Sequence, residues 1–216
     1  MNVEQARFNM IEQQIRPWNV LDPAVLSLLG SVKREDFVPA AHRTLAFMDI
    51  EVPLADGQVM LAPRVEARLL QELGLHRHEK VLEIGTGSGF MAALLAQVAD
   101  QVVGLEIEPE LALMAQDNLA RAGIQNAAVR VADGASGLVP DGPFDVILLS
   151  GSVAAVPPEL LALLRDGGRL AAIVGEEPVM RATIVRRSGE RFTTTQPWDT
   201  VAARLRNFPE PTGFRF

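Results

Sequence analysis

The chain has 216 residues, a length common for one large α/β domain, and its 48% of apolar residues can form a buried core, which excludes intrinsic disorder. Its 20 Lys and Arg against 27 Asp and Glu give a formal net charge of −7, so the basic surface that binds nucleic acid or a membrane of anionic lipid is not expected. The absence of cysteine excludes disulfides, a thiol nucleophile and Cys-bound zinc, and the 3 histidines have no metal-ligand spacing.

Three helices are expected in the first 75 residues, separated by an irregular stretch. Residues 3–16 form the first, and Pro23 begins the second, because proline fits the first helical position. Pro63 begins the third and Gly74 ends it, since glycine readily takes the left-handed conformation after a helix. We expect residues 1–75 to form a helical cap over the carboxyl ends of the strands that follow, where open α/β sheets bind ligands. The polar N-terminus lacks the apolar stretch of a signal peptide and predicts a cytoplasmic protein.

Residues 76–175 have short apolar strands that alternate with helices. The expected strands cover residues 81–84, 102–105, 128–131, 144–149 and 169–174, and the expected helices cover residues 90–98, 109–119 and 158–164. Continuous apolar strands between helices indicate a parallel sheet covered on both faces. Residues 176–216 differ, because segments 182–187 and 191–195 flank a Ser-Gly turn and predict a hairpin. The expected fold is therefore a single Rossmann-like α/β domain with a mostly parallel sheet and an antiparallel C-terminal hairpin.

A glycine-rich loop, Gly85-Thr86-Gly87-Ser88-Gly89, joins the first of these strands to a helix. Glycines let the backbone turn sharply and let a ligand approach closely, and the helix start suits a carboxylate or phosphate. Three acidic residues surround the loop: Glu83 directly precedes it, Glu106 lies 21 residues after its first glycine, and Asp133 follows the third strand. An acid about 20 residues beyond such a loop takes ribose hydroxyls, and Asp133 could accept from the amino group of adenine.

The charges around the loop favour S-adenosylmethionine (SAM) over a dinucleotide. A dinucleotide carries a doubly charged pyrophosphate, which Glu83 would repel, and its fingerprint has glycine where this chain has Phe90. SAM carries a sulfonium, an ammonium and only one carboxylate, and this charge pattern suits a ring of acids. We therefore predict that the loop binds SAM and its demethylated product, S-adenosyl-L-homocysteine.

Several segments resemble the protein-L-isoaspartate O-methyltransferase family, over nearly the whole chain. Val81 to Phe90 is similar to the family's first motif, with Phe in place of its usual Tyr, and Arg34 to Pro39 is similar to its R-E-x-F-V-P segment. Further matching segments are Asp133-Gly134, Pro143 to Asp145, Gly167 to Leu170 and Val174 to Glu176. The resemblance implies a seven-stranded SAM-dependent methyltransferase that esterifies isoaspartyl residues in damaged proteins. The cofactor-binding residues that it implies are Glu83, Gly85, Thr86, Gly87, Ser88, Gly89, Glu106, Ile107, Asp133 and Gly134.

One segment on the substrate side departs from the family. The family carries G-Q-T-I-S-Q-P, whose serine helps to hold the substrate carboxylate, but here Val59-Met60-Leu61-Ala62 replaces T-I-S-Q and Leu61 stands at the position of the serine. A hydrogen bond to a charged group contributes about 1.5–3 kcal/mol, so its loss would weaken activity rather than abolish it. A carboxylate is ionised at neutral pH and needs no general base, so the sequence identifies no catalytic residue. The substrate-side candidates are Gln58, Val59, Met60, Leu61 and Arg64.

Three functions are compatible with these patterns. The first is O-methylation of an isoaspartyl carboxylate in a peptide or protein. The second is methylation of a different substrate, such as a small-molecule carboxylate, which the apolar segment Val59-Met60-Leu61 motivates. The third is a non-catalytic module that binds SAM or a partner protein. The segment Val201 to Arg206 is a second departure, because it lacks the family's R-F-V-P-L string.

Overall fold

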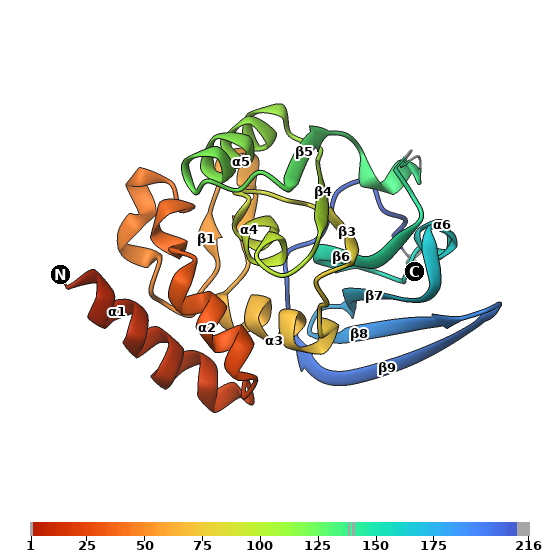
Figure 1. Ribbon diagram of the computed structural model, residues 1–216, viewed down its shortest axis with the longest axis horizontal. Helices are drawn as coiled ribbons and strands as arrows, with labels where there is room; N and C mark the ends of the chain where they lie inside the picture. The colour runs from red at the N-terminus through yellow and green to blue at the C-terminus, as the bar shows by residue number, and fades with distance from the viewer. Residues whose placement is uncertain (1, 138, 140, 211–216) are drawn as a thin grey trace, which may run out of the picture.

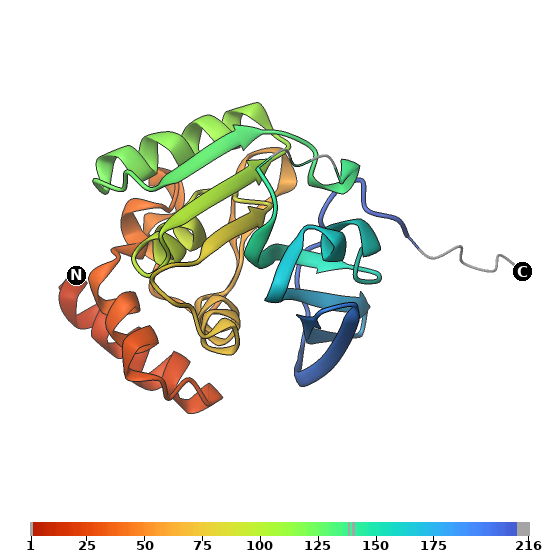
Figure 2. The same cartoon turned by 45° about the vertical axis from the view of Figure 1, so that its right-hand side comes forward.

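The computed structural model describes residues 2–137, 139 and 141–210 and is built on a seven-stranded sheet with the order β5-β4-β3-β6-β7-β8-β9 (Figure 1, Figure 2). The strands β3 to β7 run parallel, and β8 and β9 are antiparallel additions at one edge. Their bounds are β3 Lys80–Ile84, β4 Gln101–Glu106, β5 Ala127–Val131, β6 Phe144–Val153, β7 Leu164–Glu176, β8 Val179–Ser188 and β9 Arg191–Thr200. The predicted Rossmann-like sheet with an antiparallel C-terminal hairpin is confirmed.

Helices cover both faces of the sheet. The helices α3 (Pro63–Leu73), α4 (Phe90–Ala96) and α5 (Pro109–Arg121) share one apolar core with Leu148 of β6. The next residue along that strand, Leu149, points to the opposite face and packs with Leu160 of α6 (Pro158–Ala162). Side chains alternate between faces along a strand, so a strand that is apolar throughout, such as β6, needs cover on both sides.

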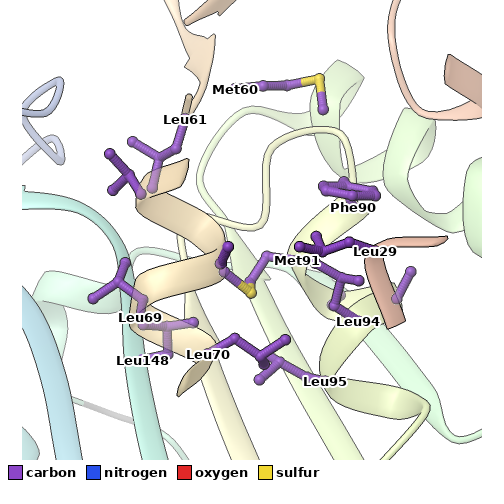
Figure 3. Close-up of a cluster of buried hydrophobic side chains, with 14 of the residues drawn as sticks. Leu29, Met60, Leu61, Leu69, Leu70, Phe90, Met91, Leu94, Leu95 and Leu148 are labelled. Atoms are coloured by element: carbon purple, nitrogen blue, oxygen red, sulfur yellow. The ribbon is translucent and has the colours of Figure 1, made fainter. Parts of the chain in front are cut away.

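The helix α3 has the sequence pattern of an element with one buried face. Leu70 of α3 lies on the side of Met91 and Leu95 of α4, while Leu69 lies on the side of Leu148 (Figure 3). Leu29 of α2 (Pro23–Ser31) belongs to the same core. Full burial of one such side chain contributes roughly 1.5–3 kcal/mol. After the last turn Gly74 takes a left-handed φ of 54°, as the sequence predicts, and donates its N–H to the carbonyl of Leu70.

The N-terminal helices form a layer beside the sheet. The helix α1 (Val3–Asn9) continues as a π-helix at Met10–Ile15, which packs against α2 and α3. The segment that reaches the carboxyl ends of the strands is the loop 54–61, which holds the short strand β2 (Val59–Met60), paired with β1 (Val52–Pro53). The expected N-terminal helices are present; the loop 54–61 is their link to the strand ends, and α2 packs on α3 and the π-helix.

Several predicted boundaries move because of tertiary pairing. The helix α6 ends at Ala162 and not at residue 164, since Leu164 already pairs with Phe144 of the neighbouring strand. The C-terminal hairpin is longer than predicted, because eight residues of β8 pair with β9 up to Ser188 and Arg191. Across residues 2–137, 139 and 141–210, helices fall short of the length and apolar character needed to cross a membrane.

Candidate cofactor and acceptor site

The glycine-rich loop between β3 and α4 turns at glycines with left-handed backbones. The φ angles of Gly85, Gly87 and Gly89 are 82°, 55° and 85°, values that side chains with a Cβ rarely adopt. Gly89 has a packing role, because a Cβ there would lie 3.2 Å from the backbone of Ala115 in α5. Gly85 and Gly87 line a cleft instead, so the loop serves both helix packing and ligand approach.

The predicted acids at the ends of β4 and β5 lie in the same cleft. Glu106 accepts from the backbone N–H groups of Gly87 at 2.8 Å and Glu108 at 3.0 Å. Asp133 accepts from the N–H of Ala135 at 2.9 Å and so begins a short 3-10 helix. The cleft has a volume of about 620 Å³, and the predicted cofactor-binding residues that line it are Gly85, Gly87, Glu106, Ile107, Asp133 and Gly134.

The buried acid Glu83 marks the inner end of the site. Ser150 Oγ donates to Glu83 Oε1 at 2.7 Å, while Oε2 is buried and has no hydrogen-bond partner among the described residues. Burial raises the pKa of Glu83 from 4.5 to about 8; hydrogen bonding with Ser150 and Thr86 opposes this shift, and the nearby Glu66 and Glu106 add to it. A buried carboxylate oxygen without a partner is costly, and a cation placed against it would remove that cost. This feature fits the sulfonium or ammonium of SAM and opposes a phosphate.

A smaller cavity of about 270 Å³ adjoins the cleft, with which it shares Leu61 and Ser150. Its lining also includes Met60, Glu83, Thr86, Ser88 and Phe90. Its wall is held by Arg34, which forms a buried ion pair with Glu66 and donates to the carbonyl of Leu61 at 2.8 Å. The Arg34 guanidinium also lies over the ring of Phe90, at 5.0 Å from the centroid. Burial raises the pKa of Glu66 to about 7, although Arg34 opposes this shift.

The substrate-side candidates fall into two groups. Gln58, Val59 and Leu61 line the cleft, and Met60 lines the smaller cavity. Arg64 lies in neither lining, because the first turn of α3 carries its side chain to a separate groove. There its Nε lies 3.2 Å from Asp49 Oδ2 and its guanidinium stacks over Trp18.

The C-terminal strap, residues 201–210, forms a wall of the cleft that sequence reasoning missed. Leu205 sits so close to the glycine-rich loop that a Cβ on Gly85 would lie 2.6 Å from its Cδ2. Asn207 donates its amide to Asp133 Oδ2 at 2.9 Å. A hydrogen bond joins the backbone N–H of Ser152 to the carbonyl of Ala203 at 2.8 Å and anchors the strap to β6.

Arg206 ties the strap to both sides of the cleft. Its guanidinium forms an ion pair with Glu108, which follows β4. The side-chain oxygen of Gln58, with its amide turned toward the guanidinium, accepts from Arg206 Nε at 2.8 Å. The strap therefore links the acceptor-side loop to the acids at the strand ends. Ser150 and Gly151, which lie within β6 and directly follow the apolar run 146–149, are the one signal in the sequence that could have extended the predicted site.

The sheet order, the glycine-rich loop and the acids at successive strand ends define the class of Rossmann-like SAM-dependent methyltransferases. The family model described as protein-L-isoaspartate(D-aspartate) O-methyltransferase matches residues 5–202. The chain belongs to this family, and the predicted resemblance is confirmed.

Two curated relatives and one solved structure illustrate the likeness. Protein-L-isoaspartate O-methyltransferase 1 of Syntrophobacter fumaroxidans is 38% identical over 195 residues, 90% of this chain and 91% of the relative. The enzyme of Methanoculleus marisnigri is 39% identical over 184 residues, 85% and 84% of the two chains. A Plasmodium falciparum structure described as this methyltransferase in complex with S-adenosyl-L-homocysteine superposes with a TM-score of 0.78 at 19% identity, covering 95% of this chain and 98% of the other.

Proposed function

We propose that this protein transfers a methyl group from SAM to the carboxylate of an L-isoaspartyl residue in a peptide or protein. The observation that carries the proposal is the buried carboxylate oxygen of Glu83 without a partner, in the small cavity that adjoins a cleft whose acids suit a nucleoside. When bound, SAM supplies an activated methyl group, and its transfer to a carboxylate oxygen yields a methyl ester and S-adenosyl-L-homocysteine.

Three acidic residues are suited to contact different parts of SAM. Glu106 already accepts two backbone N–H groups and turns its carboxylate to the cleft, where ribose hydroxyls can donate to it. Asp133 has its Oδ2 oxygen at the cleft, and an adenine amino group would compete there with the amide of Asn207. Once ionised by the bound cation, Glu83 places negative charge where a cationic group gains most, because the surroundings exclude water.

The chain's own contribution to the chemistry is alignment and exclusion of water. The acceptor carboxylate is ionised at neutral pH, so the protein needs no base. The loop 54–61 and the strap enclose the cleft, and Leu61 replaces the family's serine in the wall. Because Arg34 holds the carbonyl of Leu61, the backbone stays in place whatever side chain stands there. We infer weak binding of the substrate carboxylate and an active but slow enzyme.

The test is transfer of labelled methyl from SAM to an isoaspartyl peptide, with the same peptide carrying ordinary aspartate as control. We expect ester formation on the isoaspartyl peptide alone. Leu61→Ser should raise kcat/KM by roughly 10–100-fold, the equivalent of one hydrogen bond to a charged group. Leu61→Ala opens the same space without a hydroxyl and should give little gain. A protein that binds SAM tightly but esterifies no isoaspartyl peptide would contradict the proposal and favour a different substrate, for which the apolar Met60 and Leu61 already argue.

A further inference from the structure

A groove with its own chemistry lies beside the cofactor cleft. Its volume is about 1370 Å³, and its walls are the start of α3, the loop 49–51 and the open end of the β8–β9 hairpin. The helix α3 contacts β7 and β8 and lies beside these strands in Figure 1. Both tryptophans of the chain, Trp18 and Trp198, line it.

Two arginines one helical turn apart stack on these two tryptophans. The Arg64 guanidinium lies 4.2 Å from the centroid of Trp18, and the Arg68 guanidinium lies 4.2 Å from the centroid of Trp198. Stacking holds a guanidinium flat and leaves its N–H groups directed outward in the plane of the fork. Each arginine is therefore presented as a preformed donor along the groove.

The two arginines differ in their partners. Arg64 is paired with Asp49, whereas Arg68 has no hydrogen bond or ion pair with any described residue. The other acids of the groove are engaged, because Asp199 pairs with Arg181 at 3.2 Å and Glu51 accepts from the backbone of Ala203. In the described part of the chain, Arg68 thus has no acid within ion-pair distance, and Glu72, one turn further along α3, is the acid whose charge favours its protonated form.

A second donor without an acceptor lies against Arg68. The indole Nε1 of Trp198 is buried and has no hydrogen-bond partner within the residues that the structure describes. Unsatisfied donors that lie together need an occupant that is rich in acceptors. Around them the groove is apolar and open, since Val179 is 56% exposed, Trp18 49% and Val201 46%. An extended acidic peptide would fit this groove. Its carboxylates and carbonyls can accept hydrogen bonds from the two donors, and its side chains can pack on the apolar rim.

The groove and the cofactor cleft lie along the same two segments of the chain. Leu61 lines the cleft, and the next residue, Ala62, lines the groove. On the opposite wall Val201 lines the groove, and Ala203 of the same strap lines the cleft. A peptide lying in the groove would therefore be separated from the cleft only by these two segments.

We propose that this groove binds the stretch of substrate polypeptide that flanks the isoaspartyl residue, with an acidic side chain of that stretch paired to Arg68. The inference rests on the proposed function for its biological meaning. The binding itself is independent of methyl transfer and can be measured without it.

Intrinsic fluorescence tests the binding directly, because both reporting tryptophans lie in the groove. The probe is an extended peptide with ordinary aspartate at the central position, flanked by glutamates and free of Trp and Tyr. We expect a saturable fluorescence change with the wild-type protein, and affinity about tenfold weaker in Arg68→Glu and in Arg68→Gln. A lysine-flanked peptide should bind Arg68→Glu better than the wild type. Arg191→Glu, at the far end of the hairpin, makes the same change in net charge and should have no effect.

Methylation then separates the two proposals. With isoaspartyl peptides, Arg68→Glu should raise KM about tenfold for the long acidic peptide and leave KM of a tripeptide within twofold. Equal KM shifts for both lengths, or equal fluorescence affinity of the wild type and Arg68→Glu for the acidic peptide, would overturn the groove proposal. Saturable, Arg68-dependent binding without methylation of any isoaspartyl peptide would refute the proposed function and leave the groove standing.

Discussion

Replacing Glu83 by Gln tests the electrostatic basis of the cofactor site. Burial raises the pKa of this carboxyl from 4.5 to about 8, with Ser150 donating to one oxygen and Glu66 and Glu106 adding unfavourable negative charge. At pH 7 the free protein therefore holds a proton on Glu83. A cation bound against the unpaired oxygen favours the ionised form, so SAM binding should release this proton.

The expected change in SAM affinity with pH follows from the difference between the pH and the pKa of Glu83. At pH 7, one unit below a pKa of about 8, ionising Glu83 costs about 1.4 kcal/mol. SAM affinity should therefore rise about tenfold between pH 7 and pH 9, with nearly one proton released per SAM at pH 7 and few at pH 9. The stability of the free protein has the opposite dependence. Because the folded pKa is raised, the contribution of Glu83 to stability is complete below pH 4.5 and is lost as pH rises through about 8.

Calorimetry in buffers of different ionisation enthalpy counts the protons released. Glu83→Gln should abolish the release attributed to this residue, weaken SAM binding at pH 9 and flatten the dependence of stability on pH. Ser150→Ala keeps the carboxylate but removes its donor, so the midpoint of the pH profile should move upward. The amino group of SAM also titrates, and subtracting the Glu83→Gln data removes its contribution. Identical proton release in wild type and Glu83→Gln would refute the argument that Glu83 faces the cation.

Two further predictions concern the strap and the packing under the cofactor. Arg206→Ala removes the contacts with Glu108 and Gln58, so S-adenosyl-L-homocysteine should dissociate roughly three- to tenfold faster in stopped-flow measurements. The expected effect is modest because the lost ion pair is partly exposed. An unchanged dissociation rate would show that the strap does not retain the product. Gly134→Ala would place a Cβ 2.4 Å from Ile84 Cγ2 and should destabilise the fold by about 1–3 kcal/mol in urea titrations. The same substitution at Gly30, a helical site with its nearest contact at 4.0 Å, should be neutral or stabilising, and equal losses at both sites would contradict this reasoning.

The sequence predicted the parts of the site that depend on one strand and its own loop. Val81, Leu82 and Ile84 are apolar and Glu83 is the one charged residue among them, so the segment indicated a buried strand, and the glycines after it indicated the turn. Parallel strands place their carboxyl ends at one edge, so Glu106 and Asp133 were expected together before any contact was known. Local pattern and topology were sufficient for these residues.

The remaining features depend on contacts between distant segments. Arg206 donates to the carbonyl of Asp56, 150 residues earlier, and no local pattern reports such a pair. Arg64 was a candidate because it stands three residues after Leu61, but the turn of the helix carries it to another groove. The end of α6 was misplaced because the pairing of Leu164 with Phe144 outweighs the helical pattern.

The replaced serine also shows how this site can change its substrate without losing its fold. The backbone of residue 61 is held by Arg34, whose charge is balanced by Glu66 and whose guanidinium packs on Phe90. None of these contacts involves the side chain at position 61. Breaking the buried pair, as in Arg34→Ala, should cost about 3–5 kcal/mol, whereas exchanging Leu61 changes only the cavity wall. The backbone of residue 61 therefore contributes to stability, whereas the side chain of the same residue forms the wall that the acceptor contacts. Substitutions of this side chain can change acceptor specificity while the SAM site stays intact.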